Sequence, residues 1–261
     1  MIERLYPGTE EWGAWHPEHI ARYFYALQFT EGARILDAGT GCGYGAAILR
    51  LGKALSVDAV DIDPPTVEQA TQRFGQLGIA FRVDDCECLS SVKGPFDLIC
   101  SFENIEHLVH PEHFLRTAVS LLGPKGVLLC STPCRETSAP FSQGRPANKY
   151  HIREWYRDEF QAMLSERFSL VDMRVQVATL SFRRREAALK ALNRRLSYLR
   201  WAPMVFVLRL LKRLRVGAFE WPDISALIGP TVEDFPIYPS GYASMLGTPM
   251  THYAVCRCPR K

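Results

Sequence analysis

The sequence predicts an α/β protein with a doubly wound, mostly parallel sheet of seven strands, an N-terminal helix and a helical insertion before the last strand. Three observations predict this class. From residue 34 onward, short apolar runs alternate with stretches of helical spacing. The runs are apolar almost throughout, as in parallel strands that are buried on both faces. A glycine closes most of the helical stretches, where a helix often ends in a left-handed residue.

The length and composition suit one decorated domain. The chain has 261 residues, of which 47% are hydrophobic and 23% charged, so a disordered or fibrous protein is excluded. We therefore predict a single domain over residues 1–261, with a helical cap at 1–30 and a basic helical insertion at 181–250.

The first predicted element is a helix over His16–Leu27, with a proline near its start, where helices tolerate this residue. His19, Arg22 and Tyr23 fall on nearly one face of it. Two interpretations of this face stay open. The three side chains close over a ligand, or they pack as part of an aromatic-rich helix.

Strands and helices then alternate. The predicted strands cover residues 33–39, 55–63, 79–85, 96–102, 126–133, 168–177 and 251–258. The predicted helices between them cover residues 45–52, 66–78, 111–123 and 151–164. Residues 133–149 are rich in Pro, Ser and Gly, which predicts a loop.

The cysteines indicate a reducing compartment. There are eight, none in a Cys-x-x-Cys pair, and several lie within apolar runs that a strand would bury. This pattern predicts reduced thiols in a cytoplasmic protein and makes zinc bound through cysteine an unexpected feature. No N-terminal secretory pattern is present, and the longest apolar run, residues 201–208, is too short to span a bilayer.

The most informative motif is the glycine loop ILDAGTGCGYG at residues 35–45. Glycines directly after a first strand let the backbone approach a ligand, and the next helix begins there with unpaired N–H groups. The spacing also fits a dinucleotide fingerprint, but Asp37 before the glycines would repel a pyrophosphate. A carboxylate at that place would instead attract an ammonium group.

Two further acids follow the next strands. Asp61 ends the second strand, where it can accept hydrogen bonds from ribose hydroxyls, and Asp85 follows the third, where it can accept from an adenine amino group. An ammonium, a ribose and an adenine met in strand order describe S-adenosylmethionine.

These motifs resemble those of the class I S-adenosylmethionine-dependent methyltransferases, over about residues 15–180 and the last strand. The resemblance implies a Rossmann-like fold and the cofactor S-adenosylmethionine. It implies cofactor contacts from Asp37, Gly39, Thr40, Gly41, Gly43, Asp61, Ile62, Asp85, Cys86 and Ser101.

A second group of polar residues follows the fourth and fifth strands: Glu103, Glu106 and His107, and then His151. In a doubly wound sheet both loops lie at the carboxyl ends of the strands, where donor and acceptor must meet. Methyl transfer to a hydroxyl requires removal of its proton, and a histidine suits that task. We predict catalytic roles for His107, Glu106 and His151. The alternative is that Glu106 and His107 cap a helix and that His151 docks one.

Two family resemblances compete for the acceptor. The chain resembles bacterial O-methyltransferases of glycan and polysaccharide gene clusters and is similar to ubiquinone-pathway O-methyltransferases, which share an acid–His pair after strand four. The pattern ExxEH followed by HxxEW also resembles the small-RNA 3′-end 2′-O-methyltransferases, which hold a divalent metal. That resemblance implies a metal of the manganese or magnesium type bound by Glu103, Glu106, His107 and His151. Thr132-Pro133-Cys134 departs from the RNA enzymes' pattern.

The basic segment 183–215 has eleven Lys/Arg and one acid, a charge of +10, against +3 for the whole chain. Three interpretations stay open: peripheral contact with an anionic membrane at its inner face, a helical pair packed on the sheet or on a second subunit, and, least favoured, RNA phosphates.

The sequence thus predicts a cytoplasmic S-adenosylmethionine-dependent O-methyltransferase that acts on a sugar hydroxyl of a glycan or lipid-linked saccharide, or on a similar small molecule. The alternatives are a metal-assisted RNA 3′-end 2′-O-methyltransferase and a non-catalytic partner subunit that binds S-adenosylmethionine.

Overall fold

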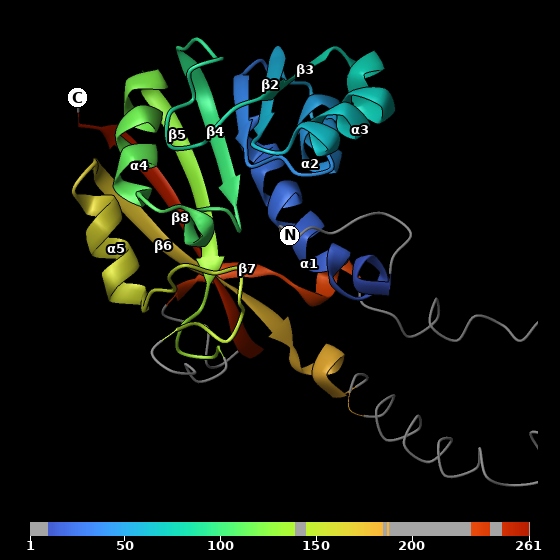
Figure 1. Cartoon of the computed structure of the whole chain (residues 1–261). Helices are drawn as coiled ribbons and strands as arrows, with labels where there is room; N and C mark the ends of the chain where they lie inside the picture. Colours follow the sequence, from blue (N-terminus) through green and yellow to red (C-terminus); the bar gives the residue numbers. More distant parts are fainter. Residues whose placement is uncertain (1–9, 139–144, 185–186, 188–230, 241–246, 261) are drawn as a thin grey trace, which may run out of the picture.

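The computed structural model describes residues 10–138, 145–184, 187, 231–240 and 247–260. Within these residues the strands form one eight-stranded sheet with the order β3-β2-β1-β4-β5-β8-β6-β7 (Figure 1). The strands are β1 (Arg34–Ala38), β2 (Ser56–Asp61), β3 (Ile79–Val83), β4 (Phe96–Phe102), β5 (Leu122–Pro133), β6 (Phe168–Thr179), β7 (Ile237–Pro239) and β8 (Gly247–Pro259).

The first five strands are parallel and the last three are antiparallel to their neighbours. The strand order reverses at β1, which pairs with β2 on one side and β4 on the other. In an open α/β sheet ligands bind beyond the carboxyl ends of the strands at this point. The topology therefore places a site beside the glycine loop that follows β1.

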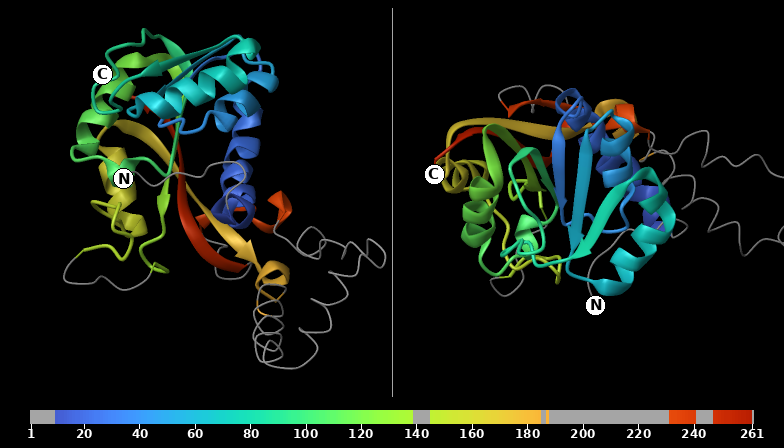
Figure 2. Two further views of the ribbon diagram at one scale, coloured as in Figure 1. Left: turned by 45° about the vertical axis from the view of Figure 1, so that its right-hand side comes forward. Right: turned by 90° about the horizontal axis from the view of Figure 1, so that it is seen from above.

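Helices cover both faces of the sheet (Figure 2). The helices are α1 (Glu10–Ala26), α2 (Tyr44–Leu51), α3 (Pro64–Phe74), α4 (Pro111–Leu121) and α5 (Arg157–Ser165). One core cluster joins α4 and α5 to the sheet, and a second joins α1 and α2 to the opposite face. Successive residues of one strand divide between the two clusters, as with Ile35 and Leu36 of β1, because side chains alternate along a strand.

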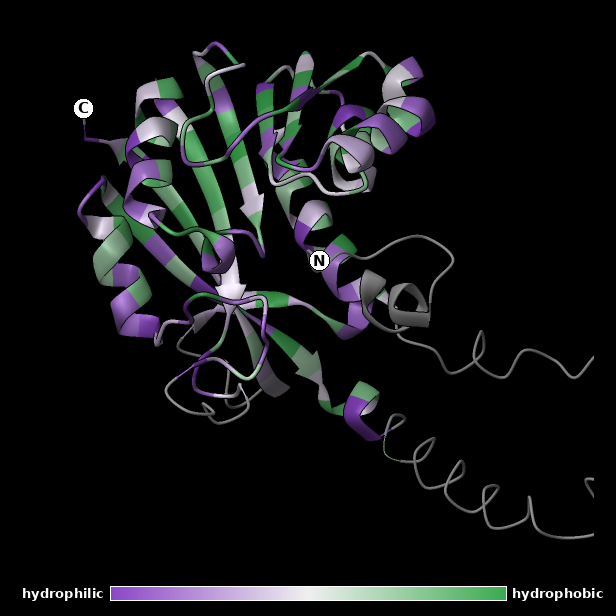
Figure 3. Ribbon diagram, in the orientation of Figure 1, coloured by the Kyte–Doolittle hydropathy of each residue, from purple (hydrophilic) through white to green (hydrophobic). Residues whose placement is uncertain are grey.

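Hydropathy follows this layering: apolar residues fill the strands, and polar residues lie along the outer sides of the helices (Figure 3). Leu36, Leu98, Ile99 and Leu128 are fully buried. The nearly continuous apolar runs of the sequence therefore correspond to strands that are covered by helices on both faces.

A buried polar group ties α1 to the distant antiparallel strands. Arg22 is fully buried and forms an ion pair with Glu18, and it donates hydrogen bonds to Gln176 of β6 (2.8 Å) and Thr251 of β8 (3.0 Å). Of the two interpretations left open for this helix face, packing holds for Arg22, which docks the helix. Glu18, His19 and Tyr23 line a cavity.

The seven predicted strands are all present, and β7 is an eighth, short strand inside the segment predicted as a helical insertion. Strand β8 begins at Gly247, four residues before the predicted start, so the predicted insertion 181–250 also contains strand residues. Most of the basic segment 183–215 lies outside the described residues, and its predicted helices and contacts stay predictions.

Two predicted helix starts were wrong. Helix α1 begins at Glu10, so that Pro17 lies within it. Helix α5 begins at Arg157, not at residue 151, and the Glu159 carboxylate accepts the backbone N–H of the N-cap residue Tyr156 (3.0 Å). The preceding Trp155 makes a parallel bridge to Cys134, which holds residues 151–155 out of helical geometry.

All eight cysteines are free thiols, as the sequence predicted. In the part of the chain that the structure describes, no helix combines the length and apolar character needed to cross a bilayer.

Candidate active site

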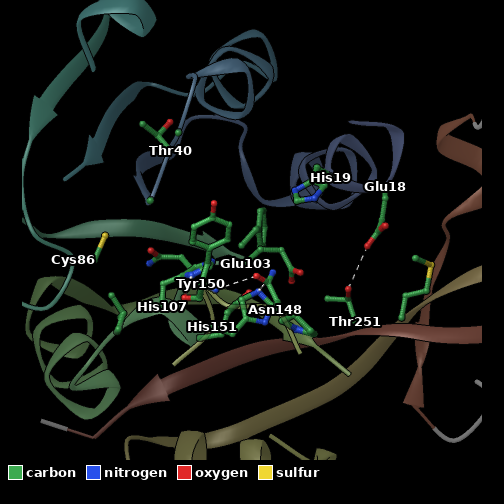
Figure 4. Close-up of a pocket in the computed structure, with 18 of the residues that line it drawn as sticks. Glu18, His19, Thr40, Cys86, Glu103, His107, Asn148, Tyr150, His151 and Thr251 are labelled. Atoms are coloured by element: carbon green, nitrogen blue, oxygen red, sulfur yellow. Dashed lines mark hydrogen bonds between the residues drawn. The ribbon is translucent and has the colours of Figure 1, made fainter. Parts of the chain in front are cut away.

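A cavity of about 820 Å³ lies beyond the carboxyl ends of the parallel strands. Its lining comes from the segments that follow β1, β2, β3, β4 and β5, together with α1 and the start of β8. Figure 4 shows Thr40 and Cys86 on one side of this cavity and His107, Tyr150 and His151 on the other. The cavity thus joins the predicted cofactor residues to the predicted catalytic residues.

The glycine loop forms the cofactor side. Gly39, Gly41 and Gly43 all have positive φ angles, of 80°, 53° and 80°, which L side chains adopt only with strain. A Cβ atom on Gly43 would lie 2.8 Å from the Ala70 side chain and 2.9 Å from that of Phe81. This glycine therefore lets α2 begin close against the neighbouring helix and strand, while Gly41 faces the cavity.

Seven of the ten predicted cofactor residues line the cavity: Gly39, Thr40, Gly41, Asp61, Ile62, Asp85 and Cys86. The other three, Asp37, Gly43 and Ser101, are outside the lining set. Ser101 is fully buried and its hydroxyl accepts a hydrogen bond from Asn104, which does line the cavity (3.0 Å). Its predicted role thus becomes that of a support for Asn104.

Asp37 lies directly behind the cavity wall. Its carboxylate accepts hydrogen bonds from the hydroxyls of Thr40 (2.7 Å) and Tyr23 (3.2 Å). Burial raises the pKa of Asp37 to about 6, although these two hydrogen bonds favour the ionised form. The carboxylate thus holds Thr40 in the glycine loop and places a titrating charge under the predicted methionine site.

The two other acids differ in their surroundings. Asp61 is buried, and its oxygens accept the N–H groups of Gly41 (2.9 Å) and Asp63 (3.0 Å), which fixes the carboxylate against the glycine loop. Asp85 is exposed at the cavity. The adjacent Asp84 instead accepts from the backbone of Asp85 and Ser91 and stabilises the turn. The structure thus gives the two neighbouring aspartates different places: Asp84 stabilises the turn, and Asp85 lines the cavity. The sequence alone did not distinguish them.

His107 has a defined tautomer. Its Nδ1 lies 3.0 Å from the carbonyl oxygen of Tyr150, and because a carbonyl only accepts, Nδ1 carries the proton. The proton-accepting nitrogen is then Nε2, on a ring that lines the cavity. This is the arrangement that a general base requires.

His151 is held by two side chains. Its Nδ1 donates to Glu154 (2.9 Å), and its Nε2 accepts from the Asn148 amide (3.0 Å). The rings of His107 and His151 meet edge to face, with centroids 5.0 Å apart. The structure therefore brings together two histidines that are 44 positions apart in the sequence, and it adds Glu154 as an orienting carboxylate.

Glu106 is the unusual group of the site. Its side chain is fully buried, and among the described residues neither carboxyl oxygen makes a hydrogen bond of good geometry, although the Thr132 hydroxyl lies near. Burial and the nearby Glu103 carboxylate raise the pKa of Glu106 well above its usual range. One oxygen of Glu106 and one nitrogen of each histidine, His107 and His151, lie within 4.8 Å of one another. A divalent cation suits such a set of two imidazoles and a buried carboxylate.

Glu103 does not belong to this close set. Its Oε1 accepts from the Ser131 hydroxyl (3.0 Å) and lies 3.7 Å from the Arg22 guanidinium. Its backbone has a positive φ angle of 49°, which is strained for a residue other than glycine. The residue lines the cavity, but its carboxylate is turned toward Arg22, so the four-residue metal set predicted from the sequence is reduced to three.

Several lining residues were not predicted, among them Glu18, Asn148, Tyr150, Arg183 and Thr251. Asn148 and Tyr150 directly precede His151, and their proximity in sequence was a usable signal. Thr251 and Glu18 come from the last strand and the first helix, and the sequence held no pattern that joins them.

The structure is typical of Rossmann-like proteins that bind a nucleotide cofactor. It combines a doubly wound sheet, a glycine loop, a cavity at the carboxyl ends of the strands and acids after successive strands. A family model described as "Methyltransferase domain" matches residues 12–193. The chain belongs to this family and is thereby a member of the class I S-adenosylmethionine-dependent methyltransferases.

Curated relatives agree with this assignment. The chain is 34% identical over 164 residues to a protein of Mycolicibacterium smegmatis named "Probable S-adenosylmethionine-dependent methyltransferase", a match that covers 62% of each chain. It is 35% identical over 113 residues to the ubiquinone biosynthesis O-methyltransferase of a Caulobacter species, covering 42% of this chain and 44% of that protein. The chain thus spans less than two thirds of the length of these relatives.

Solved structures share the fold. A chain from the complex of the Haloferax volcanii methyltransferase activator Trm112 with a methyltransferase matches 97% of this chain, with a TM-score of 0.59 and 18% identity. The [4+2]-cyclase SpnF matches over the whole chain, with a TM-score of 0.59 and 16% identity. At these identities the likeness shows the fold alone.

Proposed function

We propose that the protein transfers the methyl group of S-adenosylmethionine to a hydroxyl oxygen of a neutral sugar, within a glycan or lipid-linked saccharide or a similar small molecule. The observation that carries the proposal is the tautomer of His107, whose Nδ1–H is held by the Tyr150 carbonyl. The imidazole is thereby set to take a proton at Nε2 from an acceptor in the shared cavity.

The chemistry follows from this geometry. As the acceptor oxygen attacks the methyl carbon, the carbon–sulfur bond of the cofactor breaks and S-adenosylhomocysteine leaves. The hydroxyl proton passes to His107 as the new bond forms. His151, held by Glu154 and Asn148, packs edge to face against His107 and helps to fix the orientation of that ring.

The charge of the cavity supports a neutral acceptor. Among the described lining residues Glu18, Glu103 and Glu106 surround the acceptor side, with Arg183 as a cation there. The Glu103 and Glu18 carboxyl groups would oppose a phosphate or a sugar acid, and all three glutamates can form hydrogen bonds with hydroxyls. This balance favours a sugar over the phosphodiester chain of an RNA 3′ end.

A metal-assisted form of the reaction is the second candidate, because the buried carboxyl group of Glu106 lies beside two histidines. Glu106, His107 and His151 would hold the ion. A bound divalent cation such as manganese would lower the pKa of an acceptor hydroxyl, above all in a vicinal diol. The diol of an RNA 3′ end and that of a sugar would both meet this requirement.

The test measures metal content and acceptor use together. Purified protein is analysed for bound metal and then assayed with methyl-labelled S-adenosylmethionine, with manganese or with a chelator. The acceptors are neutral saccharides, lipid-linked saccharides, catechols and RNA with a free 3′ end. We expect label on a saccharide and its loss in His107→Gln.

The outcomes separate the candidates. Label on saccharide that survives the chelator supports His107 as a metal-free base. Labelling that requires manganese, with metal lost in Glu106→Gln and His151→Gln, supports the metal-assisted form. Transfer to RNA alone, or to no hydroxyl in a protein that binds S-adenosylhomocysteine normally, contradicts the sugar proposal.

A further inference from the structure

A second cluster of ligand-type side chains lies outside the candidate active site. Cys134 follows β5, Glu136 comes two residues later, and His252 belongs to β8. Glu136 Oε2 accepts from the Cys134 thiol (3.1 Å) and from His252 Nε2 (2.9 Å). A sulfur, an imidazole nitrogen and a carboxylate oxygen thus converge, all within 4.8 Å of one another.

The backbone around the three residues is fixed from several sides. The Cys134 N–H donates to the Met250 carbonyl (2.9 Å), and its own carbonyl accepts from Thr137 and Ser138 (both 3.0 Å). Residues 134 and 155 form a parallel bridge. The cluster therefore lies where the end of β5, the start of β8 and the segment before α5 meet. Backbone contacts among these three segments hold its residues in place without an ion.

The side chains are oriented as well. Glu136 Oε1 accepts the backbone N–H of Arg157 (2.8 Å), which leaves Oε2 for the cluster. The Phe160 ring stacks on His252, and a backbone hydrogen bond to Trp155 also supports that imidazole. An imidazole whose second nitrogen is held by the backbone is a common feature of metal-bound histidines.

The cluster opens onto a separate cavity of about 140 Å³, lined by the three residues with Arg157, Val175, Ser240 and Pro249. Cys134 and His252 are buried, whereas the Glu136 side chain is 41% exposed and has room to turn. Tetrahedral zinc, with bonds of about 2.0–2.3 Å, spaces its ligand atoms roughly 3.3–3.8 Å apart. The two distances from Glu136 Oε2, 3.1 Å to Cys134 Sγ and 2.9 Å to His252 Nε2, are somewhat shorter, and a small outward turn of Glu136 would lengthen them.

We propose that Cys134, Glu136 and His252 bind a zinc-class divalent ion, with a water from the cavity as the fourth ligand. The ion would take the place of the protons that now link the cluster. The thiol proton and the imidazole Nε2 proton would go to solvent, and Nδ1 would keep its proton for the Trp155 carbonyl. A thiolate, a carboxylate and a divalent cation sum to zero charge, which limits the cost of burial.

This proposal departs from the expectation, drawn from the sequence, that zinc is not bound through cysteine. The expectation came from the absence of a Cys-x-x-Cys pattern. The ligands proposed here form no local pattern, because Cys134 and His252 are 118 positions apart in the sequence. Only the antiparallel pairing of β5 with β8, which sets Thr132 opposite His252, brings them together.

The test uses cobalt as a spectroscopic substitute for zinc in the full chain stripped of metal. We expect one-to-one binding with a thiolate-to-cobalt charge-transfer band in the near ultraviolet, which zinc abolishes by competition. Cys134→Ser should remove the band and weaken zinc binding by a factor on the order of 100. His252→Gln should weaken zinc binding comparably and shift the band if it remains.

Controls separate this site from other clusters. Cys88→Ser/Cys258→Ser removes the two exposed thiols, His107→Gln alters the candidate active site, and His110→Gln/His113→Gln removes an exposed surface cluster. All three should keep the band. Unchanged binding of S-adenosylhomocysteine shows that each variant is folded. A band that survives Cys134→Ser, a band that Cys88→Ser/Cys258→Ser removes, or no zinc binding in the folded protein would overturn the proposal.

Discussion

At the scale of single residues, His107 is the side chain on which the proposed reaction depends. His107→Gln keeps a similar volume and removes the basic nitrogen. We expect turnover on the acceptor to fall by about 10²- to 10⁴-fold. Affinity for S-adenosylhomocysteine should stay unchanged, because the ring lies on the acceptor side of the cavity.

The matched control is His110→Gln, an exposed histidine three positions away. It should leave turnover intact. Turnover in His107→Gln that equals the wild-type value would exclude both the general-base and the metal-ligand role of this residue.

Asp37 predicts a pH dependence of cofactor binding. Burial raises its pKa from 3.8 to about 6 in the cofactor-free protein, so the group is largely protonated at pH 5 and ionised at pH 8. A bound ammonium group favours the ionised form. Affinity for S-adenosylhomocysteine should therefore rise as the pH increases toward about 6 and then level off.

Calorimetric titration between pH 5 and pH 8 tests this, with Asp37→Asn as the comparison. The variant should bind more weakly at pH 8 and lose the pH dependence. A profile that is equally steep in both proteins would assign the titration to another group.

The same raised pKa of Asp37 makes the free energy of unfolding fall as the pH increases between about 4 and 6, because the folded state binds more protons there.

The types of site residue could be predicted from the sequence, but not their orientation. Gly39 and Gly41 of the glycine loop, Asp61 and Asp85 lie at or after strand ends and line the cavity, and their contacts with the cofactor stay a prediction. Glu103 and Glu106 are three positions apart, yet one faces Arg22 and the other is buried beside two histidines. That difference depends on Arg22 of α1, which no local pattern connects to this loop.

At the scale of elements, the start of α2 depends on the close approach of Gly43 to Ala70 and Phe81. Gly43→Ala adds a clash to the strain of a positive φ angle, and we expect a loss of about 2–5 kcal/mol in the free energy of unfolding. Gly41→Ala is the matched control, because it has a positive φ angle but no atom within 4 Å of the new Cβ.

Urea unfolding measures both variants. Gly41→Ala should lose only about 1–2 kcal/mol of stability while weakening cofactor binding, since Gly41 lines the cavity. Equal losses of stability in the two variants would show that the packing of α2 against α3 and β3 does not require this glycine.

The docking of α1 depends on Arg22. Arg22→Met keeps the length of the side chain but leaves Glu18 and Gln176 without their buried partner. We expect a loss of about 3–5 kcal/mol in the free energy of unfolding at pH 7.5. The loss should be smaller at pH 5, because Glu18, whose pKa burial already raises, then takes up a proton.

Glu18→Gln is the comparison for Arg22→Met, and it should cost less because the amide still accepts from Arg22. A neutral effect of Arg22→Met in urea unfolding would contradict the docking role of this arginine.

Elements with a strong pattern of apolar residues could be predicted from the sequence. Their boundaries could not, because they depend on tertiary contacts. The seven main strands follow from apolar runs. The start of α5 at Arg157 depends on the bridge between Trp155 and Cys134, and β7 exists only because Ile237–Pro239 pairs with β6. Neither partner is close in sequence, so residue patterns alone did not indicate them.

At the scale of the whole molecule, the antiparallel edge of the sheet carries the substrate-side additions. Helix α1 crosses to β6 and β8 through Arg22, and β8 contributes Thr251 and Met250 to the cavity. The acceptor side thus combines residues from the middle of the chain with residues from both of its ends, whereas the cofactor side is built within residues 39–86. Changes at the antiparallel edge should therefore affect acceptor use more than cofactor binding.

The basic segment gives the sharpest form of this prediction. Residues 188–230, which the structure does not describe, are replaced by a Gly/Ser linker, while Arg183 is kept because it lines the cavity. We expect affinity for S-adenosylhomocysteine to stay within about threefold of the wild-type value, or about 0.7 kcal/mol, since the cofactor side is built elsewhere.

Association with liposomes that contain anionic lipid should fall steeply, because the segment 183–215 carries the excess of Lys and Arg. Liposomes of neutral lipid are the control for charge. If the intact chain does not bind anionic liposomes, the membrane hypothesis is wrong and the basic segment must face another partner. If the shortened chain loses cofactor binding instead, the segment is part of the fold.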